Sequence, residues 1–520
     1  MKKSKNIFLL SLAITFLLGL GACSKDLEIE NPNSPTIDNF WQTAQDAQNG
    51  VNSIYSTYHR VGLARNEFFL TIIRSDEGFS TSPNSVLINN FDVFNVTDYN
   101  LWETTTVWQD LYIGIARANQ VLANVPNIDM DETTKNQLLG EAKFMRGFFY
   151  YYLATLWGNV PVLLKPSVPT DYPPTTKQAD VYAQCEKDFS EAASVLPVQY
   201  DAANVGRATK GAAYGMLGKC YLQMHQYGQA ADALKWLTEG DGKNVYDLVA
   251  NYRDNFLEAT ENNKESVFEF QNSINTAENH DDDASGNPDN LNYGSSIPPF
   301  FAPRPIGFTD GQARRWCVWE FLKEKTTDGK RDPRLAATFL YDSTDERGPD
   351  FTMIYGQTFT ARGYADVTGD PIAQATTHTV YFRKFLNDAT SNGEVFHSGN
   401  NYRYLRYSDI LLLYAEALNG MGETAKAYPF VNRVRARAGL APLPTGMSQT
   451  VFLNQLKHER LTELCGEGHR WEDLVRWGDL STKLATRDES FSHYTDKYVL
   501  LPIPQYELDV NPNMVQNEGW

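Results

Sequence analysis

The chain has 520 residues and a formal net charge of −18, and its aromatic residues comprise 28 Tyr, 28 Phe and 10 Trp. This acidic balance argues against nucleic acid as a partner, because nucleic-acid binders need clustered Lys and Arg to displace the counterions of the phosphates. An apolar fraction of 42% is enough for one large helical fold or two to three domains, and so many Tyr suit a surface that binds flat, polar ligands.

The N-terminus predicts export and lipid attachment. Basic residues precede an apolar run, residues 7–20, which is too short for a typical membrane span and suits the core of a signal peptide. The run leads through Gly21 and Ala22 into Cys23, a pattern that resembles a bacterial lipobox rather than an ordinary signal peptide with a chance cysteine. We therefore predict a lipoprotein signal peptide at residues 1–22, acylation of Cys23, and an acidic, proline-containing tether at residues 23–40.

Helical periodicity marks the region that follows. Residues 41–58 and 107–125 are amphipathic, and Trp108 lies on the apolar side of the second segment, where we expect it in the core. Trp102 precedes this segment in a stretch that we expect to be a polar loop.

Two segments match the tetratricopeptide repeat at consistent internal spacing, and a third matches with its two helices separated by a proline-rich loop. In the first segment, small Gly218 and Ala230 would let two helices cross closely while Leu234 fills the groove beside them. The matching positions are Tyr214, Leu217, Gly218, Tyr221, Ala230 and Leu234; Leu411, Tyr414, Ala415, Leu418, Ala427, Val431 and Val434; and Gly147, Tyr150, Cys185, Phe189, Ala192 and Pro197. The sequence therefore predicts a mainly α fold in which tetratricopeptide-like repeats form a scaffold.

Residues 272–401 differ from this scaffold in composition. They are rich in Gly, Pro, Asn and Asp with short aromatic runs, which predicts a large loop-rich insertion carrying short strands. We place a boundary here, with an N-terminal helical region at residues 41–260 and a C-terminal region at residues 261–520 that contains the insertion and the final repeat. Beyond the insertion, residues 451–477 have apolar side chains along one side and predict another helix.

The remaining cysteines and the acidic residues suggest no catalytic or metal centre. Cys185, Cys220, Cys317 and Cys465 are dispersed, without metal-ligand spacing, and predict no disulfide framework. The acidic run at residues 281–289 could bind calcium through clustered oxygens, but it lacks the spacing of an EF-hand, so we expect a solvated loop and no cofactor.

Short motifs follow one another along the whole chain. They are the lipobox at Cys23, RSDE at 74–77, EAKFMRG at 141–147, WGNVP at 157–161, DGKRDPR at 328–334, LRYSD at 405–409, YAEA at 414–417, ERLTELCGEGHRWEDLVRWG at 459–478, PIP at 502–504 and NPN at 511–513. No single motif is specific, but their order is, and in this order they resemble the SusD/RagB family of outer-membrane nutrient-binding lipoproteins of the Bacteroidetes. In the longest motif Glu459 and Glu463, or Glu463 and Glu467, could form an acid/base pair. We expect nearby Arg460, Arg470 and Arg476 to hold these carboxylates ionised in structural ion pairs.

The resemblance implies a non-catalytic protein anchored in the outer membrane and facing the cell exterior. Members of the family bind oligosaccharides, or in some cases peptides, and act with a SusC-like TonB-dependent transporter. The ligand site that the resemblance implies combines the loop after the Asp-Glu pair with the aromatic stretch before the Asp-Gly-Lys motif. Its candidate residues here are Asp76, Phe79, Asn95, Tyr99, Trp102, Tyr293, Phe300, Phe301, Arg314 and Trp316.

Among these candidates Trp102 is the one we favour most, and we expect Trp319 to belong to the core in preference to Trp316. Sugar rings have flat C–H faces and a rim of hydroxyl groups, so a site for them needs exposed aromatic rings with polar side chains at their edges. Oligosaccharide capture is the function the sequence favours. The alternatives are a peptide ligand, a surface glycosidase, for which no catalytic motif is found, and a purely structural scaffold, which leaves the aromatic loops without a role.

Overall fold

The computed structural model describes residues 40–80, 82, 88–168, 170–274, 293–304, 306–340, 353–355, 357–358, 380–389, 393–394, 396–487 and 489–520. The predicted signal peptide, Cys23, nearly all of the tether and the acidic run at 281–289 lie outside these residues. Acylation and calcium binding therefore stay predictions.

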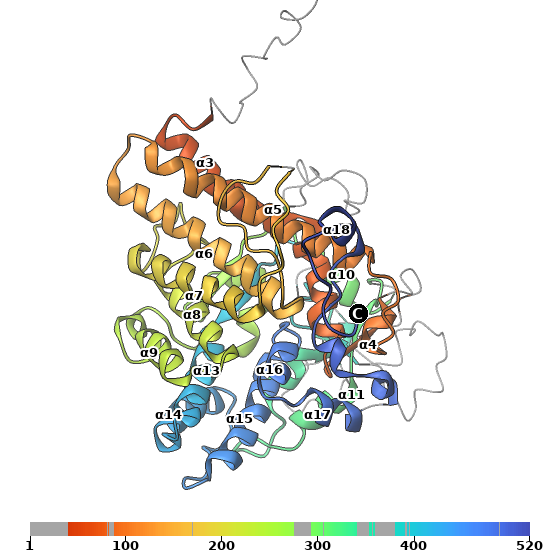
Figure 1. Cartoon of the computed structure of the whole chain (residues 1–520). Coiled ribbons are helices and arrows are strands. Elements are labelled where there is room, and N and C mark those ends of the chain that lie inside the picture. Colours follow the sequence, from red (N-terminus) through yellow and green to blue (C-terminus); the bar gives the residue numbers. More distant parts are fainter. Residues whose placement is uncertain are drawn as a thin grey trace, which may run out of the picture.

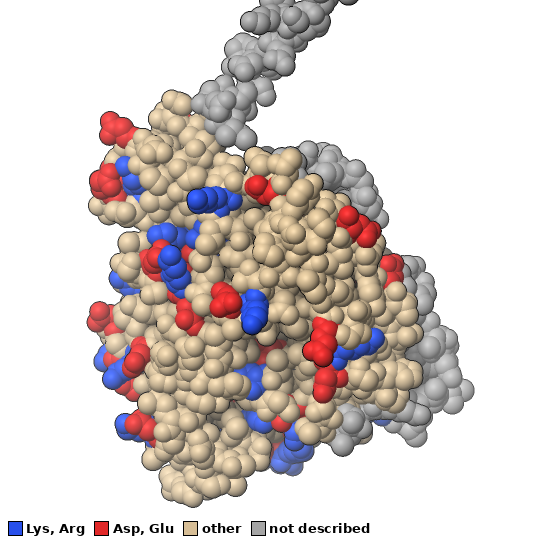
Figure 2. Space-filling model, in the orientation of Figure 1, with Lys and Arg blue, Asp and Glu red and all other residues tan. Residues whose placement is uncertain are grey.

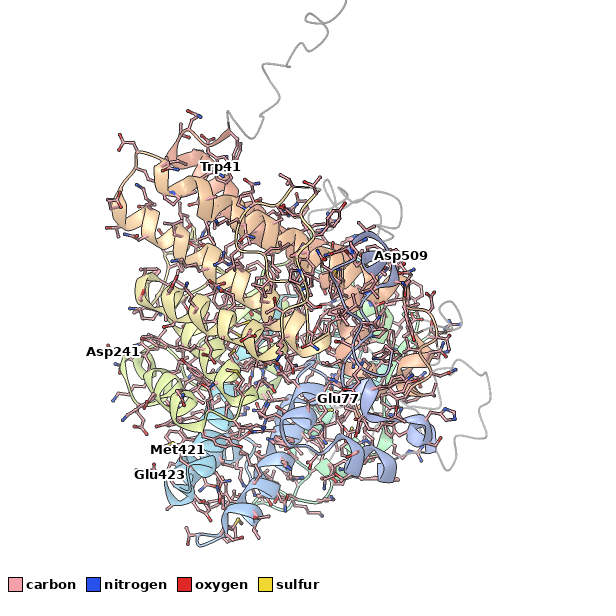
Figure 3. The ribbon with its side chains drawn as sticks, viewed as in Figure 1. Trp41, Glu77, Asp241, Met421, Glu423 and Asp509 are labelled. Atoms are coloured by element: carbon pink, nitrogen blue, oxygen red, sulfur yellow. The ribbon has the colours of Figure 1, made fainter. Side chains whose placement is uncertain are left out.

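An array of antiparallel helices forms the body of the molecule (Figure 1). Successive members pack on one another, and Trp41 and Met421 lie near its opposite ends (Figure 3). The long helices are α3 (Ala44–Tyr55), α5 (Trp102–Asn124), α6 (Glu132–Leu156), α7 (Gln178–Val195), α8 (Lys210–Gln223), α9 (Tyr227–Thr238), α13 (Tyr407–Gly420), α14 (Thr424–Arg437) and α15 (Gln449–Leu464). Shorter helices are α4 (Asn89–Asp92), α10 (Ile297–Phe301), α11 (Arg315–Phe321), α12 (Pro333–Thr338), α16 (Arg470–Arg476), α17 (Leu480–Arg487) and α18 (Gln505–Val510). The mainly helical fold predicted from the sequence is confirmed.

The three predicted repeats correspond to the packed helix pairs α6/α7, α8/α9 and α13/α14. Gly218 shows why the spacing matters. A Cβ atom at this position would lie 2.4 Å from Cγ of Leu234 on the facing helix, so only glycine allows α8 and α9 to approach this closely. Side-chain caps fix where several helices begin: Asp131 accepts a hydrogen bond from the backbone N–H of Thr134 at 2.8 Å at the start of α6.

Three predicted helix boundaries are wrong. Helix α5 begins at Trp102, so this residue lies in the first turn of the helix and not in a loop before it. The segment 451–477 forms two helices, α15 and α16, because Gly466 and Gly468 between them adopt φ values of +81° and +83° that end α15. The first helix ends at Tyr55 and continues as a 3₁₀ turn, Ser56–His59.

The structure has short antiparallel strand pairs, and strands β3 to β7 lie within the predicted insertion at residues 272–401, whose strand content is thus confirmed. β2 (Ser266–Phe270) pairs with β8 (Tyr402–Arg406), with Phe270 opposite Tyr402. The other pairs are β1 (Gly78–Ser80) with β3 (Gly311–Ala313), β4 (Phe339–Leu340) with β7 (Tyr381–Phe382), and β5 (Met353–Ile354) with β6 (Gln357–Thr358). Because the insertion begins after β2 and ends before β8, it leaves and rejoins the array at one place, and α9 packs directly on α13 across it.

A buried ion-pair network stabilises the β2/β8 strand pair, where the insertion leaves and rejoins the helical array and which we call the root of the insertion. Arg406 on β8 contacts Glu265 at 2.7 Å, Glu463 at 3.0 Å and Glu467 at 2.7 Å. Lys384 from the insertion contacts Glu467 at 2.6 Å. The carboxylates that the sequence singled out are thus structural, as predicted.

The partners of these carboxylates differ from those predicted. Arg460 pairs with Asp409 and Asp473, Arg470 with Asp76, and Arg476 with Glu416 and Asp473. The reason is helical geometry: Arg460 follows Glu459 by one residue, about 100° around α15, and so projects from a different side of the helix than Glu459 and Glu463.

Charged side chains on the face shown in Figure 2 lie mainly over the helical array, whereas the broad area below α5 and α18 carries few charges. Within the described part of the chain, no helix combines the length and the hydropathy that crossing a membrane requires.

Candidate functional site

Trp102, Phe300, Phe308 and Phe396 lie together with Arg65 in what we call the aromatic cluster. The guanidinium of Arg65 lies 5.1 Å from the ring centroid of Trp102 and 4.8 Å from that of Phe300. Phe308 and Phe396 lie 5.2 Å from each other and 5.7 Å each from Phe300, measured between ring centroids. The Trp102 residue is 38% exposed and the three phenylalanines are partly exposed, so the cluster offers ring surface to solvent.

Local backbone geometry places the cluster. Arg65 belongs to a single π-helical turn, Gly62–Asn66, that packs on α5. A Cβ atom on Gly62 would lie 2.4 Å from the carbonyl oxygen of Thr106, so glycine is what lets this turn approach α5 and bring Arg65 beside Trp102. Gly62 also donates its backbone N–H to Asp110 at 2.8 Å, which fixes the turn in place.

Helix α10 supplies the other side of the cluster. Its prolines at the first helical positions start a short helix whose Phe301 is buried against Gly311. Phe300, the preceding residue, projects in another direction and reaches Arg65. Of the predicted site residues, the structure therefore brings Trp102 and Phe300 together, while Phe301 lies in the core.

Four other predicted residues form an internal contact layer. Asp76 is fully buried and accepts from Arg470 at 2.7 Å, and the indole N–H of Trp316 donates to the backbone carbonyl of Asp76. Arg314 is buried, donates to the carbonyl of Gly78 at 2.8 Å and lies 5.6 Å from the Phe79 ring centroid. These contacts give Asp76, Arg314 and Trp316 structural partners, and only Phe79 in this group is partly exposed.

The last three predicted residues lie apart from the cluster. The ring of Tyr99 contacts Trp520 near the C-terminus at 5.7 Å, and the ring of Tyr293 contacts His59 at 5.5 Å. Asn95 is exposed, and its backbone N–H donates to the carbonyl of Asn90 at 2.9 Å.

The expectation for Trp319 is wrong. Trp319 is 57% exposed, whereas Trp316 is 8% exposed. Both belong to the short helix α11. Positions three residues apart on a helix differ by about 300°, that is, by about 60° in the opposite sense, so the two side chains project from neighbouring parts of the helix surface. The contacts that each ring makes, rather than the helix face, therefore decide which ring is covered. Trp316 is covered by Arg487, whose guanidinium lies 3.9 Å from its ring centroid.

Arg65 and Phe396 are cluster residues that the sequence did not indicate. Phe396 lies in a polar stretch near the end of the insertion, and only its aromatic character marks it. Arg65 had a weak signal, since it begins a polar stretch, residues 65–67, between apolar residues.

Glu463, one of the carboxylates that the sequence singled out, is unsuited to acid/base catalysis. Burial raises the pKa of Glu463, but Arg437, Arg406 and Arg334 outweigh burial and hold this pKa well below its ordinary value. Among the described residues, no group of three or more His, Cys, Asp and Glu side chains could hold a metal ion.

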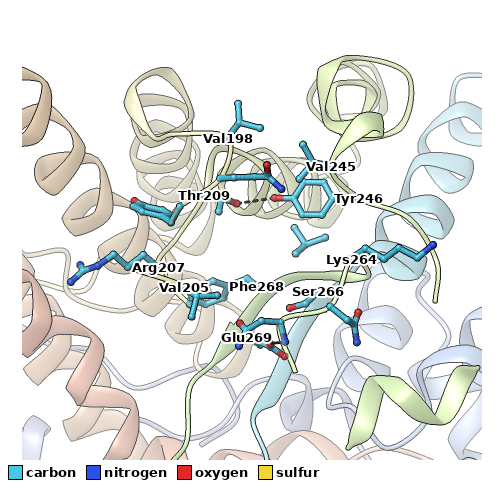
Figure 4. A pocket seen from close by; sticks show the side chains of 16 residues that line it. Val198, Val205, Arg207, Thr209, Val245, Tyr246, Lys264, Ser266, Phe268 and Glu269 are labelled. Carbon is cyan, nitrogen blue, oxygen red and sulfur yellow. Dashed lines mark hydrogen bonds between the residues drawn. The ribbon is translucent and has the colours of Figure 1, made fainter. Parts of the chain in front are cut away.

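A hollow of about 380 Å³ lies elsewhere, between the loop before α8 and strand β2 (Figure 4). Among its polar side chains, Thr209 and Tyr246 share a hydrogen bond of 2.9 Å, and Arg207 contacts Glu141 at 2.8 Å. None of the residues of the aromatic cluster lines it.

The helical scaffold and the exposed ring surface are features of a ligand-binding protein. Comparison with known proteins places it in a family. The SusD family model matches residues 239–520, and a second model, described as starch-binding and associating with the outer membrane, matches residues 27–222. The chain belongs to the SusD family, whose members are non-catalytic surface glycan-binding proteins associated with the outer membrane.

Individual relatives agree with this assignment. SusD-like protein P2 of Formosa agariphila is 27% identical, and the match covers 99% of both chains. A SusD superfamily structure from Bacteroides vulgatus superposes with a TM-score of 0.80 at 27% identity, covering 92% of this chain and 100% of that one. A laminarin-binding SusD-like protein superposes with a TM-score of 0.74, also at 27% identity, with coverage of 92% and 100%.

Proposed function

We propose that the protein captures oligosaccharides outside the cell through the aromatic cluster and delivers them to a SusC-like TonB-dependent transporter. Acyl chains on Cys23 would keep it on the outer membrane. The observation that supports this most directly is the partly exposed Trp102 ring, held beside Phe300 by the guanidinium between them.

The geometry suits a sugar ring. Aromatic faces stack on the C–H faces of a pyranose and exclude water from them, while a guanidinium at the ring edge donates to hydroxyl groups. A relative with the same fold is named as laminarin-binding, so neutral glucans are the first ligands to test. Since stacking needs no fixed hydroxyl pattern, we expect the cluster to tolerate variation in the glycan.

Binding of laminarin oligosaccharides to residues 23–520, measured by calorimetry beside an array of other glycans and peptides, tests the proposal. Trp102→Ala should weaken glycan binding about tenfold or more, because a central aromatic contact of a binding site is worth about 2 kcal/mol. Trp319→Ala is the matched control, since it removes an exposed tryptophan from outside the cluster. Binding of peptides alone, or equal losses in the two variants, would overturn the assignment of the site.

The anchor and the transporter are tested in cells. Cys23→Ala should release the protein from the outer-membrane fraction, and the wild-type protein should co-purify with a TonB-dependent transporter from detergent-solubilised membranes. Retention of the variant in the membrane fraction would argue against acylation at Cys23, and purification without any transporter would argue against the partner.

A further inference from the structure

A second cleft, of about 630 Å³, lies between α11, α15, α16 and α17, whose positions appear in the lower part of Figure 1. Trp316 and Trp477 line it together with Gln455 and Arg487. No residue of the aromatic cluster lines it, so it is separate from the site proposed above.

The lining is basic in a strongly acidic protein. It includes five Lys or Arg side chains against three Asp or Glu, although the whole chain has a net charge of −18. The acids of the lining are already engaged. Glu320 contacts His458 at 3.0 Å, Asp479 contacts Lys457 at 2.7 Å, and Glu324 contacts Arg435, which lies outside the lining, at 2.8 Å.

The pKa of Glu320 agrees with this engagement. Burial raises this pKa, but hydrogen bonds from His458 and Lys323 outweigh burial and lower it to about 2. The Glu320 carboxylate therefore stays ionised and satisfied by its neighbours.

Two buried donors of the lining have no hydrogen-bond acceptor among the described residues: Nε2 of Gln455 and Nε of Arg487. Nε of Arg487 forms an ion pair with Oδ2 of Asp76 at 3.6 Å, a distance too long for a hydrogen bond, and both oxygens of Asp76 accept from Arg470. A buried N–H without an acceptor is unfavourable, so a protein usually provides one or a bound group does.

Trp316 holds the Arg487 guanidinium in place by stacking at 3.9 Å. Because the ring contacts the face of the guanidinium, the N–H donors at its edge can meet a ligand. A planar or tetrahedral oxyanion matches such donors, because a guanidinium donates to two oxygens of one carboxylate or sulfate at once. The partly exposed indole ring of Trp477 supplies the apolar surface that a sugar ring requires.

We propose that this cleft binds a saccharide bearing a carboxylate or sulfate group, with Arg487 and Gln455 donating to the oxyanion. The site goes beyond the aromatic cluster: it adds recognition of acidic sugars to a protein whose first site recognises ring faces. The basic lining also favours the approach of an anion that the rest of the surface repels.

Calorimetric titration of residues 23–520 with glucuronate, glucose 6-sulfate, glucose and inorganic sulfate tests this. We expect glucuronate and glucose 6-sulfate to bind, glucose to bind much more weakly at this site, and the binding to weaken as salt is raised. Inorganic sulfate should bind less tightly than the charged sugars, because it has no ring to meet Trp477. Equal binding of sulfate and the charged sugars would overturn the saccharide part of the proposal, and no binding of any anion would overturn all of it.

Variants locate the binding. Arg487→Gln should weaken glucuronate binding about tenfold or more, because a hydrogen-bonded charge pair is lost. Gln455→Leu removes the second donor without changing the charge and serves if Arg487→Gln folds poorly. Lys426→Gln is the control, since it removes an exposed cation on α14 whose side chain is 68% exposed. The same titrations in the Trp102→Ala background remove the ring contact of the aromatic cluster, so failure of either site is visible separately. Undiminished binding in both cleft variants would overturn the assignment.

Discussion

At the scale of single residues, Glu67 is a buried carboxyl group that should make stability depend on pH. Burial raises its pKa from 4.5 to about 8, and hydrogen bonds from Tyr152 and Thr71 oppose this only in part. The folded protein thus binds the Glu67 proton more tightly than the unfolded chain does. The associated stability is fully present below about pH 4.5 and is lost as the pH rises through about 8.

Glu67→Gln should remove this loss. The gain in unfolding free energy relative to wild type should grow between pH 5 and pH 8, by several kcal/mol at most, since a tenfold change in proton affinity is worth about 1.4 kcal/mol. Urea denaturation at a series of pH values measures it. Glu132→Gln, at a carboxylate whose side chain is 73% exposed, is the control. A constant difference between Glu67→Gln and wild type across this range would show that Glu67 does not titrate there.

Contacts between residues that lie far apart in the chain could not be predicted from the sequence. Trp108 was predicted in the core from helical periodicity and is buried. Trp316 and Trp319 were assigned in the wrong order, because what covers Trp316 is Arg487, which lies far along the chain and which no local pattern reveals. Arg65 was missed for the same reason: its role depends on Trp102 and Phe300, which come from separate elements.

At the scale of helices, the close crossing of α8 and α9 should tolerate no side chain at Gly218. Gly218→Ala places a Cβ atom 2.4 Å from Cγ of Leu234, so Leu234 or the helix axes must shift. We expect a loss of about 1–3 kcal/mol in unfolding free energy, the usual effect of overpacking a core.

A matched glycine lies on the same pair of helices. Gly228 on α9 has no atom within 4 Å of an added Cβ, so Gly228→Ala should be neutral or stabilising by up to about 1 kcal/mol through helix propensity. Chemical denaturation of the two variants compares them directly. Similar effects in both would mean that the contact with Leu234 does not limit how closely the helices approach.

Helix pairs were the part of the fold most accessible from sequence, because small residues at fixed offsets determine how neighbouring helices cross. Boundaries were less accessible. The break between α15 and α16 depends on the positive φ of Gly466 and Gly468. A glycine within an apolar periodic segment does not by itself indicate that conformation.

For the whole molecule, the sequence predicted that an insertion interrupts the scaffold but not how it is attached. β2 and β8 pair across the full length of the insertion, and strand pairing at such separation is determined by tertiary contacts rather than by local pattern. The identity of the ion-pair partners at this root was likewise inaccessible, because the arginines involved come from β8, α12 and α14.

The root makes the insertion and the helical array depend on each other for stability. Arg406 is 1% exposed and contacts three buried carboxylates, so Arg406→Met leaves excess negative charge in the core. Removing one partner from a buried ion-pair network typically costs about 3–5 kcal/mol, and we expect a loss of this size in unfolding free energy.

Arg433→Met is the control for this prediction, because Arg433 pairs with Asp247 at 2.9 Å on the surface, where both side chains are about half exposed. Its loss should cost less than about 1 kcal/mol. Amide hydrogen exchange adds the spatial test: in Arg406→Met, protection should fall in β2 and β8 before it falls in α6 and α7. The reason is that Arg406 on β8 contacts Glu265 beside β2 and Glu463 on α15, and the network does not include α6 or α7. Uniform loss of protection along the chain would show instead that Arg406 supports the molecule as a single cooperative unit and that the root has no separate role.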